Sequence, residues 1–338
     1  MSTVRSGERG ATVLLLPGQG TQYPRMAVGV YGADPVFRDT IEEFFTLAGR
    51  DGARWRRAWL TGRASSRVDE SEYSQPLLFA VDLALATALR ARGIEPDLLA
   101  GHSVGELTAA VLAGVFDLPV AVELMRERAR GLAEAPEGGM VAVAASPEDV
   151  LPLLGDGVVV GAVNGPRQLL LCGSLSGLAA VRERLRGAGV VSRPAGARSA
   201  FHSPALNEVA ERCEHVLSRA RLRPPTVPIR SGRTGRPVTD AQARTPGFWT
   251  GQIAEPVLFG EALAGLFEDL PADGPPPLLV EAGPGGSLAA LAARHRRGRG
   301  ATILTALPSA PGGRNVDEAS EAAAYLRLLE RVTTLRAR

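Results

Sequence analysis

A serine stands between two glycines in the stretch Gly101-His-Ser-Val-Gly105, and this spacing can produce a reactive hydroxyl. Residues 98–100 are apolar and indicate a short buried strand, whereas residues 106–114 have the pattern of a helix. A strand, a tight turn with serine and a helix form the setting that a nucleophile elbow requires, and glycines permit the strained turn. Ser103 would project its hydroxyl from this turn, with the backbone N–H of Val104 on the same side.

A serine hydroxyl is a weak nucleophile unless a neighbouring base accepts its proton. The chain has four histidines that could supply this base. At an elbow His102 is expected to point away from the serine, His215 lies on a helix among charged residues, and His295 lies in an arginine-rich stretch. His202 lies in a loop at the point where a small inserted unit rejoins the larger one. His202 is therefore the candidate base.

The elements that must position these residues alternate between strands and helices over most of the chain. Buried-strand patterns cover residues 11–16, 98–100, 227–231, 278–281 and 301–304, and helical patterns cover residues 75–91, 106–114, 118–133, 204–220, 262–270 and 316–335. This alternation is typical of an α/β fold.

A different pattern begins after the glycine-rich stretch Ala135-Pro-Glu-Gly-Gly139. Strand, helix, strand, strand, helix and strand patterns follow at residues 140–145, 147–154, 158–163, 168–172, 176–186 and 190–194. The order β-α-β-β-α-β is that of a ferredoxin-like unit. We therefore predict a large α/β domain over residues 1–135 and 202–338, interrupted by a ferredoxin-like α+β subdomain over residues 136–201. A cleft between them would be the natural ligand site.

Composition limits the classes of function. The 338 residues are 45% apolar, and the net charge of +2 implies no nucleic-acid partner. Cys172 and Cys213 form no CxxC pair, which suits a reducing cytoplasm. The apolar stretch 76–90 carries Asp82 and is shorter than a membrane span. We therefore predict a cytoplasmic protein that neither enters a membrane nor binds nucleic acid.

The motifs together resemble those of the malonyl-CoA:acyl-carrier-protein transacylase family, which includes acyltransferase domains of polyketide synthases. They occur in family order over roughly residues 11–285 and are Pro17-Gly-Gln-Gly20, Gln75-Pro76, Gly101-His-Ser-Val-Gly-Glu106, Arg128 within residues 128–132, Gly138-Gly-Met140, Asn164-Gly-Pro166, Ala200-Phe-His-Ser203, Gln252 before Glu255-Pro-Val257, and Glu281-Ala-Gly-Pro-Gly285. The resemblance implies a hydrolase-like large domain with a parallel sheet and a ferredoxin-like insert, which agrees with the pattern of elements.

The resemblance also implies ping-pong acyl transfer. Ser103 would attack the thioester of an acyl-CoA while His202 takes its proton, and the backbone N–H groups of Val104 and Gln19 would hold the oxyanion. The acyl group would then pass from Ser103 to the phosphopantetheine thiol of an acyl carrier protein. In the family a main-chain carbonyl orients the histidine, and the matching position here is Gln252. Acyl-CoA is a substrate in this scheme, and no bound cofactor or metal is implied.

Two further residues concern the acyl group. Arg128 matches the family arginine that binds the free carboxylate of malonyl, for which a guanidinium fork is well suited. Phe201, in Ala-Phe-His, matches the malonyl-selective form of polyketide synthase domains, because the ring fills the space of an α-methyl group. The resemblance therefore implies a malonyl donor, in polyketide or fatty acid biosynthesis.

Departures from the family pattern leave other functions open. Leu16, Leu132 and Ser199 stand where the family often has phenylalanine, methionine and histidine. These changes leave room for a discrete acyltransferase that moves a non-malonyl acyl group between carrier proteins. An editing acyl-carrier-protein hydrolase is a second alternative, against which Arg128 argues. A non-catalytic carrier-binding module and an unrelated serine esterase are the remaining ones.

A dense basic stretch, Arg294-His-Arg-Arg-Gly-Arg299, suggests a contact for the partner. Arg296, Arg297 and Arg299 could meet acidic residues of a carrier protein or the phosphates of CoA and raise the association rate. The alternative is a solvated basic surface. The chain begins with Met1 and shows no flanking ketosynthase or carrier segment, which predicts a free-standing enzyme that acts in trans.

Overall fold

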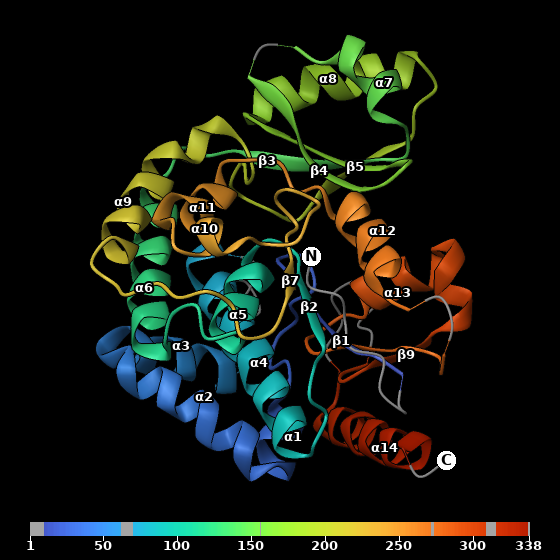
Figure 1. The fold of residues 1–338 in the computed structure, drawn as a ribbon. Helices are drawn as coiled ribbons and strands as arrows, with labels where there is room; N and C mark the ends of the chain where they lie inside the picture. The colour runs from blue at the N-terminus through green and yellow to red at the C-terminus, as the bar shows by residue number, and fades with distance from the viewer. Residues whose placement is uncertain (1–9, 62–69, 156, 272–273, 309–315, 337–338) are drawn as a thin grey trace.

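A parallel sheet lies at the centre of the larger part of the molecule. The computed structural model describes residues 10–61, 70–155, 157–271, 274–308 and 316–336 (Figure 1). The five strands, in the spatial order β7-β2-β1-β8-β9, are β7 (Ile229–Arg230), β2 (Leu98–Gly101), β1 (Thr12–Leu16), β8 (Leu278–Glu281) and β9 (Thr302–Thr305). All neighbouring strands pair in parallel. The predicted parallel sheet is therefore confirmed.

Helices cover both faces of this sheet, because alternate residues of a strand point to opposite faces. Leu14 and Leu16 of β1 belong to the main core, whereas Val13 and Leu15 belong to a second core on the other face. The main core is built with α2 (Pro35–Leu47), α4 (Ser71–Ala91), α5 (Val104–Leu112), α6 (Leu118–Glu134) and α9 (Asn207–Leu217), and the second with α12 (Phe259–Asp269) and α13 (Ser287–Arg294). The remaining α-helices of this part are α1 (Val28–Ala33), α3 (Gly49–Thr61), α10 (Asp240–Ala243), α11 (Pro246–Thr250) and α14 (Glu318–Arg336).

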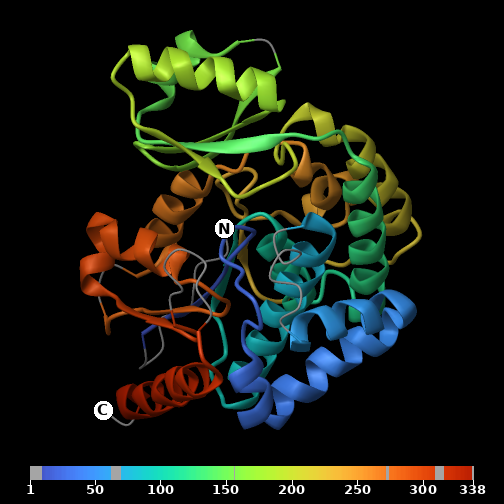
Figure 2. The same cartoon turned by 180° about the vertical axis from the view of Figure 1, so that it is seen from behind.

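A smaller antiparallel sheet forms a separate subdomain with its own core. Its strands, in the order β4-β5-β3-β6, are β4 (Val158–Gly165), β5 (Gln168–Gly173), β3 (Gly139–Val143) and β6 (Ser192–Ala195). Helices α7 (Pro147–Val150) and α8 (Leu175–Gly187) cover the side of this sheet that faces away from the large part (Figures 1 and 2). The predicted small antiparallel subdomain is confirmed, and its strand order is that of a ferredoxin-like unit. The predicted boundaries at residues 135/136 and 201/202 stay a prediction.

None of the helices in the described ranges is long and apolar enough to cross a lipid bilayer.

Two buried carboxyl groups lie close to the carboxyl end of β8. Asp82 of α4 is fully buried, and neither of its carboxylate oxygens has a hydrogen-bond partner among the residues that the structure describes. Glu281, at the end of β8, is also fully buried and accepts a hydrogen bond from the backbone N–H of Ala289 at 2.7 Å. Burial raises the pKa of Asp82 well above its ordinary value and raises the pKa of Glu281 to about 7.

These carboxyl groups should make the free energy of unfolding fall as the pH rises from about 5 to about 7. A carboxyl whose pKa is raised by folding stabilises fully below its unfolded pKa, and that contribution is lost as the pH rises through the folded pKa, which is about 7 for Glu281. Glu281→Gln should flatten this fall, because a neutral amide oxygen can still accept from Ala289. Calorimetric unfolding midpoints between about pH 5 and about pH 8 test this. The exposed Glu261→Gln variant should follow the wild type, and an undiminished fall in Glu281→Gln would contradict the prediction.

Candidate active site

The turn between β2 and α5 has the geometry of a nucleophile elbow. Ser103 adopts φ 54° and ψ −122°, a left-handed region that is strained for a residue with a side chain. A Cβ on Gly105 would lie 2.1 Å from the carbonyl oxygen of Leu16, and a Cβ on Gly101 would lie 2.3 Å from the backbone of the following helix. The two glycines therefore let the turn pack against β1, and Ser103 stands at its tip.

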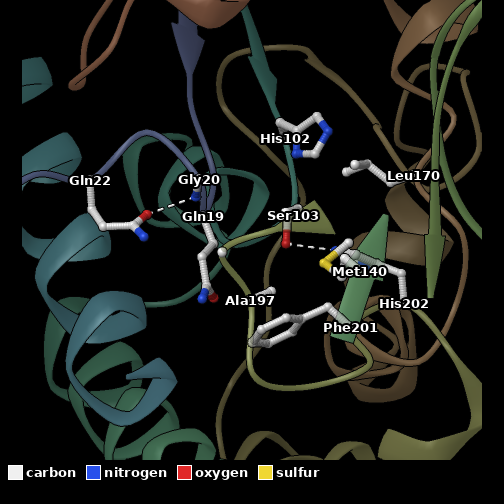
Figure 3. A pocket seen from close by; sticks show the side chains of 12 residues that line it. Gln19, Gly20, Gln22, His102, Ser103, Met140, Leu170, Ala197, Phe201 and His202 are labelled. Carbon is white, nitrogen blue, oxygen red and sulfur yellow. Dashed lines mark hydrogen bonds between the residues drawn. The ribbon is translucent and has the colours of Figure 1, made fainter. Parts of the chain in front are cut away.

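The Ser103 hydroxyl lies within hydrogen-bond distance of one histidine. The Ser103 Oγ atom is 2.9 Å from Nε2 of His202 (Figure 3). On the other side of the ring, Nδ1 of His202 is 2.8 Å from the main-chain oxygen of Gln252 and 3.0 Å from that of Glu255. Carbonyl oxygens only accept hydrogen bonds, so Nδ1 carries the proton and Nε2 is left as the acceptor for the serine hydroxyl.

Gln252 contacts both members of this pair. Its main-chain oxygen accepts from His202, and its side-chain Nε2 donates to the main-chain oxygen of Ser103 at 2.9 Å. The structure thus places Gln252 where the sequence predicted a histidine-orienting residue. The second carbonyl, that of Glu255, was not predicted. Its residue type gives no signal, and only its position does, because Glu255 ends the turn that begins at Gly251.

Burial keeps the imidazole of His202 neutral. The ring is only 3% exposed, and this desolvation, followed by the nearby His102, lowers the pKa of His202 to about 3. A neutral imidazole with a free lone pair on Nε2 can accept the serine proton across the physiological pH range. The arrangement is therefore that of a nucleophile with its general base.

Two backbone N–H groups lie near the serine. Val104 is the first residue of α5, so its N–H has no acceptor within the helix. Gln19 follows β1 and lines the same cavity as Ser103 (Figure 3). A Cβ on Gly18 would lie 2.5 Å from the carbonyl oxygen of His102, so the loop after β1 packs directly on the elbow. The predicted oxyanion residues thus flank the serine.

Arg128 of α6 is buried, and no acidic side chain of the described residues pairs with it. The side chain is 1% exposed, and its Nε donates to Oε1 of Gln75 at 2.9 Å. Gln75 in turn donates to Oε1 of Gln19 at 2.7 Å, which links the arginine to the wall of the cavity. The Nη2 atom of Arg128 is buried and has no hydrogen-bond partner in the described part of the chain. Burial lowers the pKa of Arg128 to about 10, so the group stays charged near neutral pH.

A cavity of about 470 Å³ opens in front of the serine, between the elbow and the small subdomain. The small subdomain contributes Met140, Leu170 and Ala195, and Phe201 and His202 lie next to them (Figure 3). Much of this wall is apolar. The cleft expected between the two domains is thus present.

His102 borders the same cavity as Ser103, and the expectation that its side chain points away from the serine stays a prediction. Its Nε2 lies 2.8 Å from Oδ1 of Asn164 on β4, so the ring joins the elbow to the small subdomain. Because this nitrogen bonds Asn164 and His202 holds the hydroxyl, His102 takes no part in the serine–base contact.

The basic stretch lies away from this cavity. It forms the short 3-10 helix η4 (Arg296–Gly300), in which Arg299 is exposed. Arg296 lines a second cavity of about 460 Å³ together with Arg167 and Arg294, and Asn164 borders this cavity as well. Arg296 and Arg297 both border a further groove near Leu270.

Comparisons with known proteins agree with this geometry. The family model described as "Acyl transferase domain" matches residues 13–282. The chain is 40% identical over 287 residues to one component of the phenolphthiocerol/phthiocerol polyketide synthase of Mycobacterium tuberculosis, covering 84% of this chain but 19% of that protein. It is 35% identical over 255 residues to the mycoketide-CoA synthase of the same organism, covering 75% of this chain and 6% of that protein. The chain thus spans less than a fifth of the length of these relatives.

Solved structures are similar over nearly the whole chain. One is the acyl transferase domain of SpnD in complex with 2-(pent-4-yn-1-yl)malonyl, with a TM-score of 0.85, 34% identity, and coverage of 96% of this chain and 77% of that one. Another is the malonyl-CoA:acyl carrier protein transacylase of Xanthomonas oryzae, with a TM-score of 0.80, 25% identity, and coverage of 96% and 99%.

Proposed function

The chain belongs to the acyl transferase domain family and is an acyltransferase, and we propose that it moves malonyl from malonyl-CoA to the phosphopantetheine thiol of an acyl carrier protein. The proposal also assigns Ser103 as nucleophile and His202 as general base. Acyl-CoA is then a substrate, and the reaction requires no bound cofactor. We assign the reaction to polyketide or fatty acid biosynthesis, because one relative is named as part of a polyketide synthase and another as a malonyl-CoA:acyl carrier protein transacylase.

The contacts around Ser103 support a two-step exchange. Ser103 Oγ attacks the thioester carbonyl while Nε2 of His202 takes its proton, and the N–H groups of Val104 and Gln19 receive the negative oxygen. The C–S bond then breaks, and His202 returns the proton to the CoA sulfur. In the second step the carrier thiol gives its proton to His202 and attacks the acyl-Ser103 ester. Ser103 regains its proton when the ester C–O bond breaks.

The buried guanidinium of Arg128, which has no acidic partner among the described residues, is the observation that carries the malonyl assignment. A buried cation without a counter-charge is costly unless an anion reaches it. Its Nη2 atom has no hydrogen-bond partner among the described residues, and a guanidinium can hold a carboxylate through two parallel hydrogen bonds. Malonyl has a free carboxylate, whereas acetyl has none.

Phe201 supports malonyl over a branched donor. Its ring is 2% exposed and lies on the cavity wall beside His202, with ring centroids 6.4 Å apart. A rigid ring at this position would collide with an α-methyl group, a type of exclusion worth about 1–3 kcal/mol.

A second candidate function is the transfer of a longer, non-malonyl acyl group between carrier proteins. The apolar cavity wall formed by Met140 and Leu170 favours this candidate.

Intact-protein mass spectrometry after mixing with malonyl-CoA, acetyl-CoA or methylmalonyl-CoA tests the proposal. We expect a malonyl adduct on the wild type, little adduct from the other two donors, and none on Ser103→Ala. An adduct from acetyl-CoA or a longer neutral donor, without one from malonyl-CoA, would overturn the malonyl assignment and favour the second candidate. An adduct that persists in Ser103→Ala would overturn the nucleophile.

We further propose that the arginines of η4 approach the carrier protein or the phosphates of CoA. The double variant Arg296→Glu/Arg297→Glu should raise KM for the carrier about tenfold, because reversing charges at the rim of a protein–protein interface slows association. Transfer to free pantetheine, which is small and uncharged, should change little. Steady-state transfer assays at two salt concentrations test this. The matched control Arg219→Glu/Arg221→Glu lies elsewhere on the surface, and an equal effect there would contradict a local contact.

A further inference from the structure

Arg233 links two parts of the segment whose main-chain carbonyl groups bind the His202 ring. Its side chain is 19% exposed and forms a two-pronged ion pair with Glu255, in which Nε lies 2.6 Å from Oε2. Its Nη1 donates to the main-chain oxygens of Gly247 at 3.1 Å and Phe248 at 2.7 Å. The guanidinium also lies 5.3 Å from the centre of the Phe248 ring. One side chain therefore joins α11 to Glu255, which lies beyond the next turn of the chain.

The segment between these contacts supplies both acceptors of the His202 proton. It runs from α11 through the 3-10 helix η3 (Gly251–Ile253) to Glu255. The main-chain oxygens of Gln252 and Glu255 hold Nδ1 of His202, so the shape of this segment fixes the ring. A Cβ on Gly251 would lie 3.3 Å from Oε1 of Glu255, which shows that the ion pair packs directly against the turn.

The other end of Arg233 is anchored next to the elbow. Its backbone N–H donates to Oγ of Ser231 at 3.1 Å, within the tight turn that follows β7. In this turn a Cβ on Gly232 would lie 2.8 Å from the carbonyl oxygen of Gly101, where the elbow begins. The carbonyl of Gly232 also accepts from the backbone N–H of Leu258 at 2.6 Å. Arg233 thus spans from the strand end beside Ser103 to the segment that orients His202.

We propose that Arg233, through its ion pair with Glu255, is a positioning residue that keeps the imidazole of His202 aligned with Ser103. The proposal rests on the Ser103–His202 chemistry proposed above. The guanidinium touches neither the serine nor the imidazole, and acts through the carbonyl groups that it fixes. A fork of N–H donors suits this task, because it can bind a carboxylate and two carbonyls at the same time.

Labelling of Ser103 by an alkyl fluorophosphonate tests this without reference to the acyl group. The rate constant kinact and the affinity constant KI are measured for the wild type, Arg233→Met, Arg233→Lys and Arg236→Met, with unfolding midpoints for each. We expect kinact to fall about tenfold in Arg233→Met with KI unchanged, and less in Arg233→Lys, because a lysine keeps the charge without the fork. Arg236 is exposed on the same turn, and Arg236→Met should label like the wild type.

The outcomes separate this inference from the proposed function. A wild type that is not labelled at Ser103 would overturn the proposed nucleophile. Wild-type labelling with an unchanged kinact in Arg233→Met, or a change confined to KI, would overturn the role of Arg233. Glu255→Gln gives a second route if Arg233→Met does not fold, because it removes the ion pair and keeps the main-chain carbonyl. Glu255→Gln should lower kinact as well, and the double variant should lose no more than Arg233→Met alone.

Discussion

Replacement of His202 by alanine should slow the acylation of Ser103 by a factor of about 10²–10⁴, the usual contribution of a general base. The reason is the 2.9 Å contact between Nε2 of His202 and the serine oxygen. His102, the other imidazole of the cavity, bonds Asn164 and does not replace it. Rapid-quench measurement of acyl-enzyme formation from the CoA thioester gives this rate directly.

The control for this variant is His215→Ala, since His215 is exposed on α9 and should leave the rate unchanged. The wild-type rate should also show no inflection from His202 between about pH 5 and about pH 8. The pKa of about 3 keeps the imidazole neutral there, and the base is lost only when the pH falls toward that value. An acylation rate in His202→Ala within tenfold of the wild type would rule out His202 as the base.

Sequence patterns predicted the elements of the fold best where nearly every side chain of the element is buried. The apolar run of β1 and the long helix α4 were predicted because most of their side chains lie in the core. Helices α1, α2 and α3 were all missed, and in α3 the buried contacts come mainly from Trp55 and Trp59 among exposed arginines. The spatial order of the strands could not be read from the chain, because β1 pairs with β8, which lies near the other end of the sequence.

In the candidate site, the residues that act through their side chains could be predicted from the sequence, whereas a residue that acts through its backbone could not. Ser103, His202 and Arg128 could be named from motifs, because their chemistry depends on residue type. The second acceptor for the His202 proton is the carbonyl of Glu255, and every residue has a carbonyl. The ion pair between Arg233 and Glu255 forms because the fold brings two distant parts of the chain together. Such contacts have no signature in residue type and became visible only with the fold.

Replacement of Arg128 by glutamine should change the choice of acyl donor. The kcat/KM for malonyl-CoA should fall by about 10²–10³, because loss of one partner of a buried charge pair typically costs about 2–5 kcal/mol. The kcat/KM for acetyl-CoA should stay level or rise, since a neutral acyl group leaves the wild-type guanidinium buried and unpaired. The ratio of the two values, from transfer assays with one carrier protein, measures the preference for a carboxylate.

The matched control is Arg126→Gln on the same helix. Arg126 is half-exposed and pairs with Asp51 at 3.1 Å, so its loss should leave the donor ratio unchanged. The unfolding midpoint of Arg128→Gln should not fall, because the variant removes a buried charge that has no acidic partner in the described residues. Equal losses for both donors would instead indicate that Arg128 supports the fold, through its hydrogen bond to Gln75, and binds no carboxylate.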